Sequence, residues 1–158
     1  LIEIAGRALS PGINDPFTAM SCLDWLGSSL AVMATRTPFD GRHYNSEGQL
    51  RLIAKYVSQD LFLRKNLSRI RVYAATDRNA ATHFLSIIGR LLLLPVAPEI
   101  RQLLLEQAFE LSECAKDSLC DLDVEELQSR VKILNSIQPG SRQNDALVHE
   151  HHWLGGGA

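Results

Sequence analysis

The chain has 158 residues, of which 46% are hydrophobic, 22% charged and 6% aromatic, and its formal net charge is −2. The length suits one domain, and the composition excludes a disordered chain, a collagen-like repeat and a disulfide scaffold. The 16 basic and 18 acidic residues lack the basic excess that is typical of nucleic-acid binders. Cys22, Cys114 and Cys120 cannot all pair within one chain, so we expect free, mostly buried thiols in a reducing compartment.

The first nine residues are typical of the end of a helix, and no signal-peptide pattern precedes them. We therefore expect that the chain is an excised part of a longer protein. A second helix is predicted from Pro16 to Ala34, because Asp15 is a good N-cap and proline suits the first helical turn. Its one charge is Asp24, which would cost about 2.5–3.5 kcal/mol at the centre of a membrane span. A helix buried on most sides of a bundle is the preferred interpretation, with Arg7 or Arg78 as the partner of Asp24.

Residues 37–41 contain proline and glycine and are predicted to turn the chain. A small β-hairpin follows over residues 42–55, with a polar turn at residues 45–48. An isolated hairpin is only marginally stable in water. We therefore expect this hairpin to lie against the helices.

The remaining elements are predicted to be helices. From about Ser58 the apolar residues recur with helical spacing. Asp77 is expected to cap a helix that ends at Leu94, before a proline, and Pro98 begins the next. The residues Asp123–Glu126 form a predicted capping box before a last helix to about 137. The sequence thus predicts a mainly α single domain over residues 1–138, a bundle of five to six helices with one small β-hairpin, and a loose, flexible C-terminal tail over residues 139–158.

The stretch between the first two helices concentrates polar groups at a helix N-terminus, where free N–H groups can bind an anion. The candidate ligand-binding residues are Arg7, Ser10, Gly12, Asn14, Asp15 and Thr18. The alternative is that Asp15 uses those N–H donors as a cap and pairs with Arg7. Ser10 is a poor nucleophile candidate, because no histidine lies near it in sequence and the G-x-S-x-G pattern is missing.

The residues from Ile4 to Ala19, above all Arg7-Ala8-Leu9-Ser10-Pro11-Gly12-Ile13-Asn14-Asp15-Pro16, resemble the signature of a bacterial family of predicted multi-pass membrane proteins (domain of unknown function 2254). The later pattern of a hairpin, a Leu/Arg-rich helix and paired helices is also similar. The resemblance implies the C-terminal soluble region of such a protein, tethered to a bacterial inner membrane. We expect this region to lie on the cytoplasmic side. It implies no reaction.

Charge is segregated along the chain. Residues 36–78 carry nine basic and four acidic side chains, and residues 99–126 carry two basic and nine acidic ones. A basic surface is predicted on the outer side of the helix after Ser58, made of Arg64, Lys65, Arg69 and Arg71. It could face anionic lipid headgroups, meet the acidic segment around Glu106 and Glu110 in the same or another subunit, or be an ordinary solvated helix face.

No metal or cofactor is assigned. His149, His151 and His152 are the weak metal candidates, but they adjoin a glycine run and lack the packed surroundings of functional metal sites. His83 is predicted to be a partly buried packing residue. The sequence lacks a P-loop, a dinucleotide fingerprint and a zinc-binding spacing.

Three functions remain open. The preferred one is a regulatory, ligand-binding or assembly domain of a bacterial membrane protein. Its expected partner is a small anion, lipid headgroups, the membrane-embedded part of the same protein or a second copy of the chain. No nucleic-acid partner is expected. The second is an enzyme that acts on an anionic small substrate at the loop from Arg7 to Asp15, although the sequence leans against an enzyme. The third is a purely structural role, in which the helix from Pro16 and the apolar run Leu91–Leu94 pack an oligomer.

Overall fold

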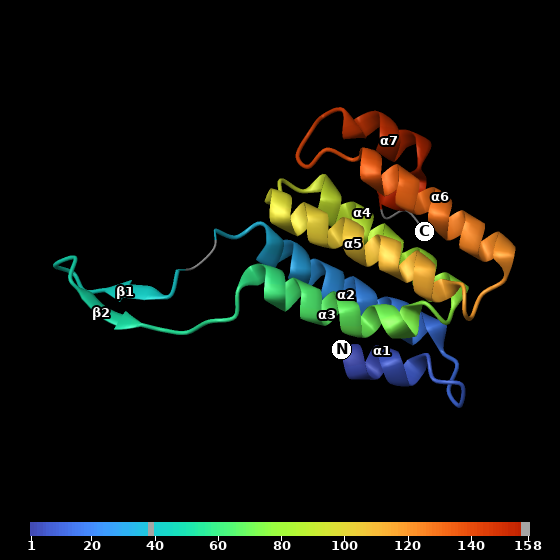
Figure 1. The fold of residues 1–158 in the computed structure, drawn as a ribbon, viewed down its shortest axis with the longest axis horizontal. Helices are drawn as coiled ribbons and strands as arrows, with labels where there is room; N and C mark the ends of the chain where they lie inside the picture. Colours follow the sequence, from blue (N-terminus) through green and yellow to red (C-terminus); the bar gives the residue numbers. More distant parts are fainter. Residues whose placement is uncertain (38–39, 156–158) are drawn as a thin grey trace.

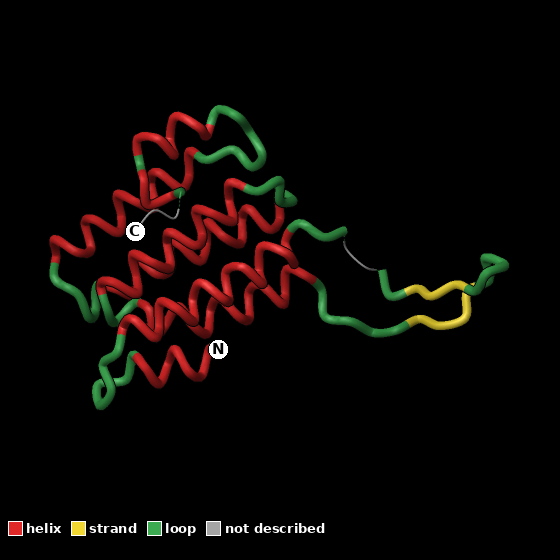
Figure 2. The backbone as a smooth tube through the Cα atoms, turned by 180° about the vertical axis from the view of Figure 1, so that it is seen from behind, coloured by secondary structure: helices red, strands yellow, loops and turns green. Residues whose placement is uncertain are grey.

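The computed structural model describes residues 1–37 and 40–155, which form a helical bundle with one projecting β-hairpin (Figures 1 and 2). Within these residues the elements are α1 (Ile2–Ala8), α2 (Pro16–Ala34), β1 (Arg42–Tyr44), β2 (Leu50–Ile53), α3 (Gln59–Ala74), α4 (Arg78–Leu93), α5 (Pro98–Ala115), α6 (Asp121–Ser136), α7 (Asn144–Glu150) and a 3-10 turn at His152–Leu154. The predicted mainly α bundle with one small hairpin is confirmed. The described residues hold seven helices rather than five or six, because α7 forms in the segment that the sequence predicts as a tail.

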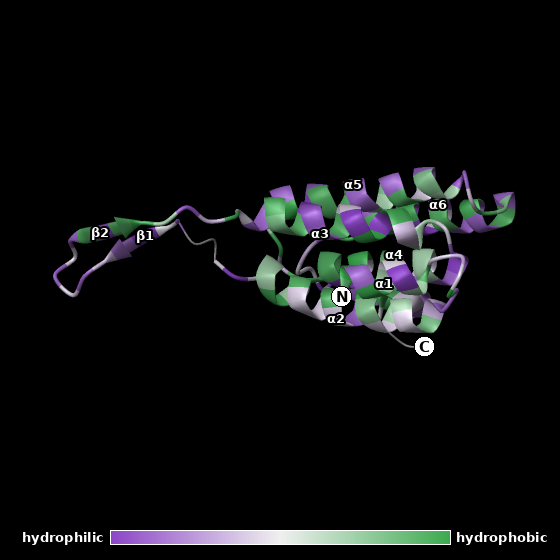
Figure 3. Ribbon diagram, turned by 90° about the horizontal axis from the view of Figure 1, so that it is seen from below, coloured by the Kyte–Doolittle hydropathy of each residue, from purple (hydrophilic) through white to green (hydrophobic). Residues whose placement is uncertain are grey.

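The helices form two layers, with α3, α5 and α6 above α1, α2 and α4 in Figure 3. Helix α4 lies at the centre and packs on α2, α3, α5 and α6. Its apolar residues are almost all buried, and they include Leu91 and Leu92. The apolar run Leu91–Leu94 therefore belongs mainly to the core of this chain and does not offer the oligomer surface that the sequence suggested.

Local signals begin the long helices where the sequence predicts. The Asp15 side chain accepts a hydrogen bond from the N–H of Thr18 at 3.1 Å, and Asp77 accepts one from the N–H of Ala80 at 2.8 Å. Pro98 is the first residue of α5. Helix α6, however, begins at Asp121, two residues before the predicted capping box. The predicted capping box does not form, since Asp123 and Glu126 pair with Arg78 instead.

The hairpin does not lie against the helices, so this part of the prediction is wrong. Figure 1 shows it as an arm that extends away from one end of the bundle, and every residue of both strands is exposed. The hairpin keeps its shape through its own turn, where Oδ1 of Asn45 accepts hydrogen bonds from the N–H groups of Glu47 and Gln49 at 3.1 and 2.8 Å. Of the turn predicted over residues 37–41, Pro38 and Phe39 lie outside the described residues.

The C-terminal residues differ from the loose tail that the sequence predicts. Helix α7 and the 3-10 turn lie beside α6 in Figure 1, and Leu154 is fully buried. It packs against Gly89 of α4, where a Cβ atom would lie 2.5 Å from Cδ2 of Leu154. The tail is ordered by this contact between distant parts of the sequence, which local patterns do not reveal. Gly156, Gly157 and Ala158 lie outside the described residues.

Candidate functional site

The loop between α1 and α2 is held by its own hydrogen bonds. The backbone oxygen of Ser10 accepts from the N–H groups of Ile13 and Asn14 at 3.0 and 2.9 Å, and the N–H of Asp15 donates to the oxygen of Ala8 at 2.8 Å. The hydroxyl of Ser10 donates to the backbone oxygen of Arg7 at 2.6 Å. Ser10 is therefore part of the turn, and its hydroxyl proton is already used.

Asp15 acts as the cap of α2. Its carboxylate accepts hydrogen bonds from both the hydroxyl and the N–H of Thr18, at 2.6 and 3.1 Å. These bonds, the one from the hydroxyl first, hold the pKa of Asp15 below its ordinary value of 3.8. Asp15 thus caps the helix through the N–H of Thr18, which is one of the two interpretations that the sequence left open. The enzyme hypothesis loses the free carboxylate that it needed here.

A cleft of about 380 Å³ lies beside the loop. Its lining is Glu3, Ile4, Arg7, Ala8, Ile13, Asp15 and Thr18. The structure thus brings together three of the six predicted residues, Arg7, Asp15 and Thr18, whereas Ser10, Gly12 and Asn14 do not line the cleft. Among the described residues Arg7 has no ion pair, so the predicted pair with Asp15 does not form.

The sequence analysis missed Glu3, although a signal was present. Glu3 and Arg7 are four residues apart in α1 and therefore share a helix face. The cleft holds two carboxylates and one guanidinium beside the exposed apolar side chains of Ile4 and Ile13. This lining is complementary to a small molecule that carries a cationic group, or charges of both signs, rather than to a simple anion.

Asp24 is paired, but with partners that the sequence did not indicate. Its Oδ1 atom accepts a hydrogen bond from Nη2 of Arg90 at 2.8 Å and lies 3.0 Å from Nε2 of His83. Both partners are on α4, which packs along α2. Neither Arg7 nor Arg78 pairs with Asp24. Arg78 points toward α6 instead, and His83 is partly buried, as the sequence predicts, with its Nε2 atom facing Asp24 but making no hydrogen bond.

The predicted basic surface is divided between two environments. Arg64 pairs with Glu106 at 3.1 Å, and Arg71 pairs with Glu110 and donates to Gln107 at 2.9 Å. The acidic segment of α5 therefore meets the basic helix α3 within the same chain. Arg71 does not belong to an outer surface, since its side chain is only 15% exposed. Lys65 and Arg69 are exposed and have no ion pair among the described residues.

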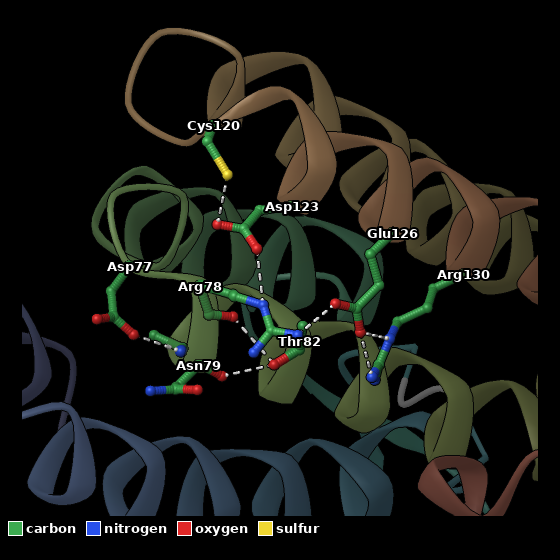
Figure 4. Close-up of polar contacts among 9 residues, drawn as sticks. Asp77, Arg78, Asn79, Thr82, Cys120, Asp123, Glu126 and Arg130 are labelled. Atoms are coloured by element: carbon green, nitrogen blue, oxygen red, sulfur yellow. Dashed lines mark hydrogen bonds and ion pairs between the residues drawn. The ribbon is translucent and has the colours of Figure 1, made fainter.

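A second ionic network joins α4 to α6 (Figure 4). The guanidinium of Arg78 lies 2.8 Å from Asp123 and 2.6 Å from Glu126, and Arg130 also binds Glu126 at 2.8 Å. Burial raises the pKa of Glu126, but the hydrogen bonds from Arg78 and Arg130 outweigh burial and hold it below 4.5. The network stabilises the packing of α4 and α6 and leaves none of these groups free for chemistry.

The histidines near the C-terminus do not form a metal site in the described part of the chain. No group of three His, Cys, Asp or Glu side chains there is arranged to hold a metal ion. The rings of His149 and His152 lie 6.3 Å apart between centroids. Of the three thiols, Cys22 is buried, whereas Cys114 and Cys120 are exposed, so the prediction of mostly buried cysteines is wrong for two of them.

Helix α2 presents a largely uncharged face to the outside, with the half-exposed Asp24 and its partner Arg90 at the edge of this face. Phe17, Trp25 and Val32 are 75%, 70% and 51% exposed, and their spacing puts them on one side of the helix. Within the described residues, α2 is also the one helix long and apolar enough to cross a membrane by length and composition. Its opposite face is packed on the bundle through residues such as Leu23 and Leu30, so the helix is buried on one side rather than on most sides.

A family model and three curated relatives match part of the chain. The profile of a family described as "Predicted membrane protein (DUF2254)" matches residues 1–90, from α1 into α4. Uncharacterized proteins of Mycobacterium bovis and of two strains of Mycobacterium tuberculosis are 30% identical over 89 residues, which is 56% of this chain and 17% of each relative. The chain thus spans about a sixth of the length of these relatives. No solved structure matches it.

Proposed function

Because the chain belongs to the DUF2254 family of predicted membrane proteins, we propose that it is a non-catalytic assembly domain of a bacterial membrane protein. The observation that carries this proposal is the largely uncharged outer face of α2, with the exposed side chains of Phe17, Trp25 and Val32 and with Asp24 neutralised by Arg90 at its edge. We propose that this face packs against the remaining segments of the same protein. The curated relatives are about six times longer than the aligned region, so most of such a protein lies outside this chain.

The hydroxyl groups on this face support contact with an apolar partner. The hydroxyls of Ser21, Ser28 and Ser29 each donate to the backbone oxygen four residues earlier, at 2.9–3.1 Å. Because these hydroxyl donors are satisfied within the helix, the face can be buried without leaving an unsatisfied hydroxyl donor. Serine hydroxyls are tolerated in the same way within membrane helix bundles.

The position of the domain in the whole protein is part of the proposal. We place it in the C-terminal region, on the cytoplasmic side of the bacterial inner membrane. The exposed free thiols of Cys114 and Cys120 support this side, because free thiols persist in reducing compartments.

The test uses the chain co-produced with the remaining segments of its full-length protein as separate polypeptides. The wild-type chain should sediment with the membranes that hold those segments, and Trp25→Glu should release most of it. Phe109→Glu is the matched control, because Phe109 is 57% exposed on α5 and its variant should stay bound. Equal retention of both variants would overturn the proposal.

The cleft beside Arg7 favours a second candidate function, the binding of a small ligand. Its carboxylates, Glu3 and Asp15, and its guanidinium suit a molecule that carries an ammonium group together with an anionic one. Asp15 is committed to its cap, so Glu3 and Arg7 are the groups available to a ligand.

A thermal-shift screen tests this candidate with amino acids, polyamines, nucleotides, phosphorylated metabolites and lipid headgroups. A ligand at about 100 times its dissociation constant adds about 2.7 kcal/mol, which raises the Tm of a domain of this size by several degrees. The shift should disappear in Glu3→Gln or Arg7→Gln and persist in Arg36→Gln, which lies away from the cleft. A shift that survives in both cleft variants would exclude this site.

A further inference from the structure

The projecting arm, residues 40–57, exposes many large apolar side chains to solvent. Six large apolar side chains of the arm are 48–67% exposed: Tyr44, Leu50, Leu52, Ile53, Tyr56 and Val57. A two-stranded hairpin is marginally stable by itself, and both of its edges offer unpaired backbone groups. These features are typical of an element that is covered by a partner.

The arm is also built to hold a defined shape. Gly41 has a φ of +77°, and a Cβ atom there would lie 2.4 Å from the backbone oxygen of Ala54, so a residue without a side chain is required at its base. At the tip, Gly48 has a φ of +76° and the Asn45 side chain closes the turn. A preformed element loses little conformational entropy on binding.

The distribution of polarity along the arm favours a protein partner over a lipid bilayer. The tip is polar and carries Glu47, which a tip-first insertion would bring into the bilayer at high cost. The apolar side chains lie along the strands instead, above all along β2, which is the apolar strand in Figure 3. Arg42, Arg51 and Lys55 accompany them. The partner surface must therefore be apolar and acidic.

The bundle carries such a surface at its other end. Leu122, at the start of α6, is 76% exposed. Around it in the sequence, Asp117, Asp121 and Glu125 are exposed carboxylates with no ion pair among the described residues. Figure 1 shows the arm leaving one end of the bundle and the connection between α5 and α6 at the opposite end. An arm cannot reach this surface in its own chain.

We propose that the arm binds the α5–α6 turn of a second copy of this chain. Two copies that lie antiparallel place each arm on the other's turn, so the contact is made twice and closes as a twofold dimer. In this contact Leu52 covers Leu122, and Arg51, its neighbour at the bulge of β2, and Lys55 face Asp121 and Glu125. The dimer is separate from the contact proposed for α2, and neither depends on the other.

The first test is the mass of the 158-residue chain in solution, measured by sedimentation velocity over a range of micromolar concentrations. We expect a dimer that Arg51→Glu weakens at least about tenfold, the loss of about 1.4 kcal/mol, and that Arg51→Glu combined with Asp121→Arg restores. Lys65→Glu is the control, because Lys65 is an exposed cation of α3 outside the proposed contact. A chain that stays monomeric at the highest concentration, or a dimer that Arg51→Glu leaves unchanged, overturns the proposal.

A cross-link gives the second test, since the exposed thiol of Cys120 precedes Asp121. In Leu52→Cys, mild oxidation should join the introduced thiol of one copy to Cys120 of the other, giving a disulfide dimer on a non-reducing gel that Cys120→Ser abolishes. A band of monomer mass, or binding of a monomer to vesicles of phosphatidylglycerol in flotation, would overturn the proposal and assign the arm to another partner. Circular dichroism of each variant confirms that the bundle is folded.

Discussion

Gly27 lies where α2 packs against α4, and a Cβ atom added there would lie 2.8 Å from Cγ2 of Ile87. Ile87 is buried and β-branched, so its side chain has little freedom to move aside. Overpacking of a close contact typically costs about 1–3 kcal/mol.

We therefore expect Gly27→Val to lower the free energy of unfolding by about 1–3 kcal/mol, as measured by urea denaturation. Gly12→Val is the matched control, because no atom lies within 4 Å of a Cβ at Gly12. It should change stability by about 0.5 kcal/mol or less. Equal effects at both glycines would contradict the close packing of the two helices.

Glu126 links stability to pH through Arg78 and Arg130. Its pKa in the folded chain is held below 4.5, so its contribution is present above the unfolded pKa and disappears as pH falls through the folded pKa. We expect the Tm to fall between about pH 5 and pH 3, and Glu126→Gln to flatten this fall while costing about 1 kcal/mol at neutral pH. Glu125→Gln, at an exposed neighbouring position, should keep the wild-type pH profile.

The sequence predicts residue roles where partners are close in the chain. Asp15 and Thr18 are three residues apart, and capping by Asp15 was one of the two interpretations that the sequence allowed. Asp24 and Arg90 are 66 residues apart, and the sequence offers several cations for one carboxylate. Only the packing of α4 along α2 selects Arg90 over Arg7 and Arg78.

At the scale of elements, the C-terminal segment shows how burial replaces local propensity. Helix α7 has seven residues and no side-chain cap, which explains why no sequence pattern predicts it. The ring of Trp153 lies 4.9 Å from the guanidinium carbon of Arg130, and Leu154 is fully buried beside it in the sequence. The segment is therefore held by α4 and α6.

Leu154→Ala should accordingly lower the free energy of unfolding by about 2–5 kcal/mol, because it leaves a cavity in the core. The exposed Leu122 provides the comparison, since Leu122→Ala removes the same atoms from the surface and should cost about 0.5 kcal/mol or less. Thermal melts of dilute protein measure both. Indistinguishable melts would mean that the C-terminal segment does not belong to the folded unit.

Local signals define four of the five long helices, α2 to α5, because a proline, an aspartate cap or apolar spacing lies within each segment. They also define the hairpin, through its polar turn. They do not give the direction of the arm, which depends on what the neighbouring helices cover. The physical rule that a hairpin needs support is sound, but it left open whether that support comes from the same chain.

The whole molecule combines a bundle that covers its own hydrophobic core with an arm whose strands contribute no residue to that core. Gln59 closes the bundle at the base of the arm, where its side-chain amide donates to the backbone oxygens of Met33 and Arg36 at 3.0 and 2.8 Å. The ends of α2 and α3 are thus joined independently of the strands.

Replacement of residues 40–57 by a short Gly-Ser linker should therefore leave a cooperative, fully helical bundle. We expect a Tm within a few degrees of the wild-type value under dilute conditions, because the exposed strands bury no core residue. Circular dichroism checks this result. A molten chain without a cooperative transition would show that the arm supports the bundle.

The hydrogen bonds that Gln59 makes at the base of the arm also have a consequence for the rate of folding. The chain between α2 and α3 is long, but a hairpin forms in about 1–10 μs and its pairing brings Arg42 and Ile53 together. The docking of α3 on its neighbours then resembles closure of a short loop. Extra residues at the tip would lie outside the paired residues of β1 and β2. There, a doubling of loop length raises the free energy of loop closure by only about 0.6 kcal/mol. The arm can therefore vary in length during evolution without slowing the folding of the helices that carry it.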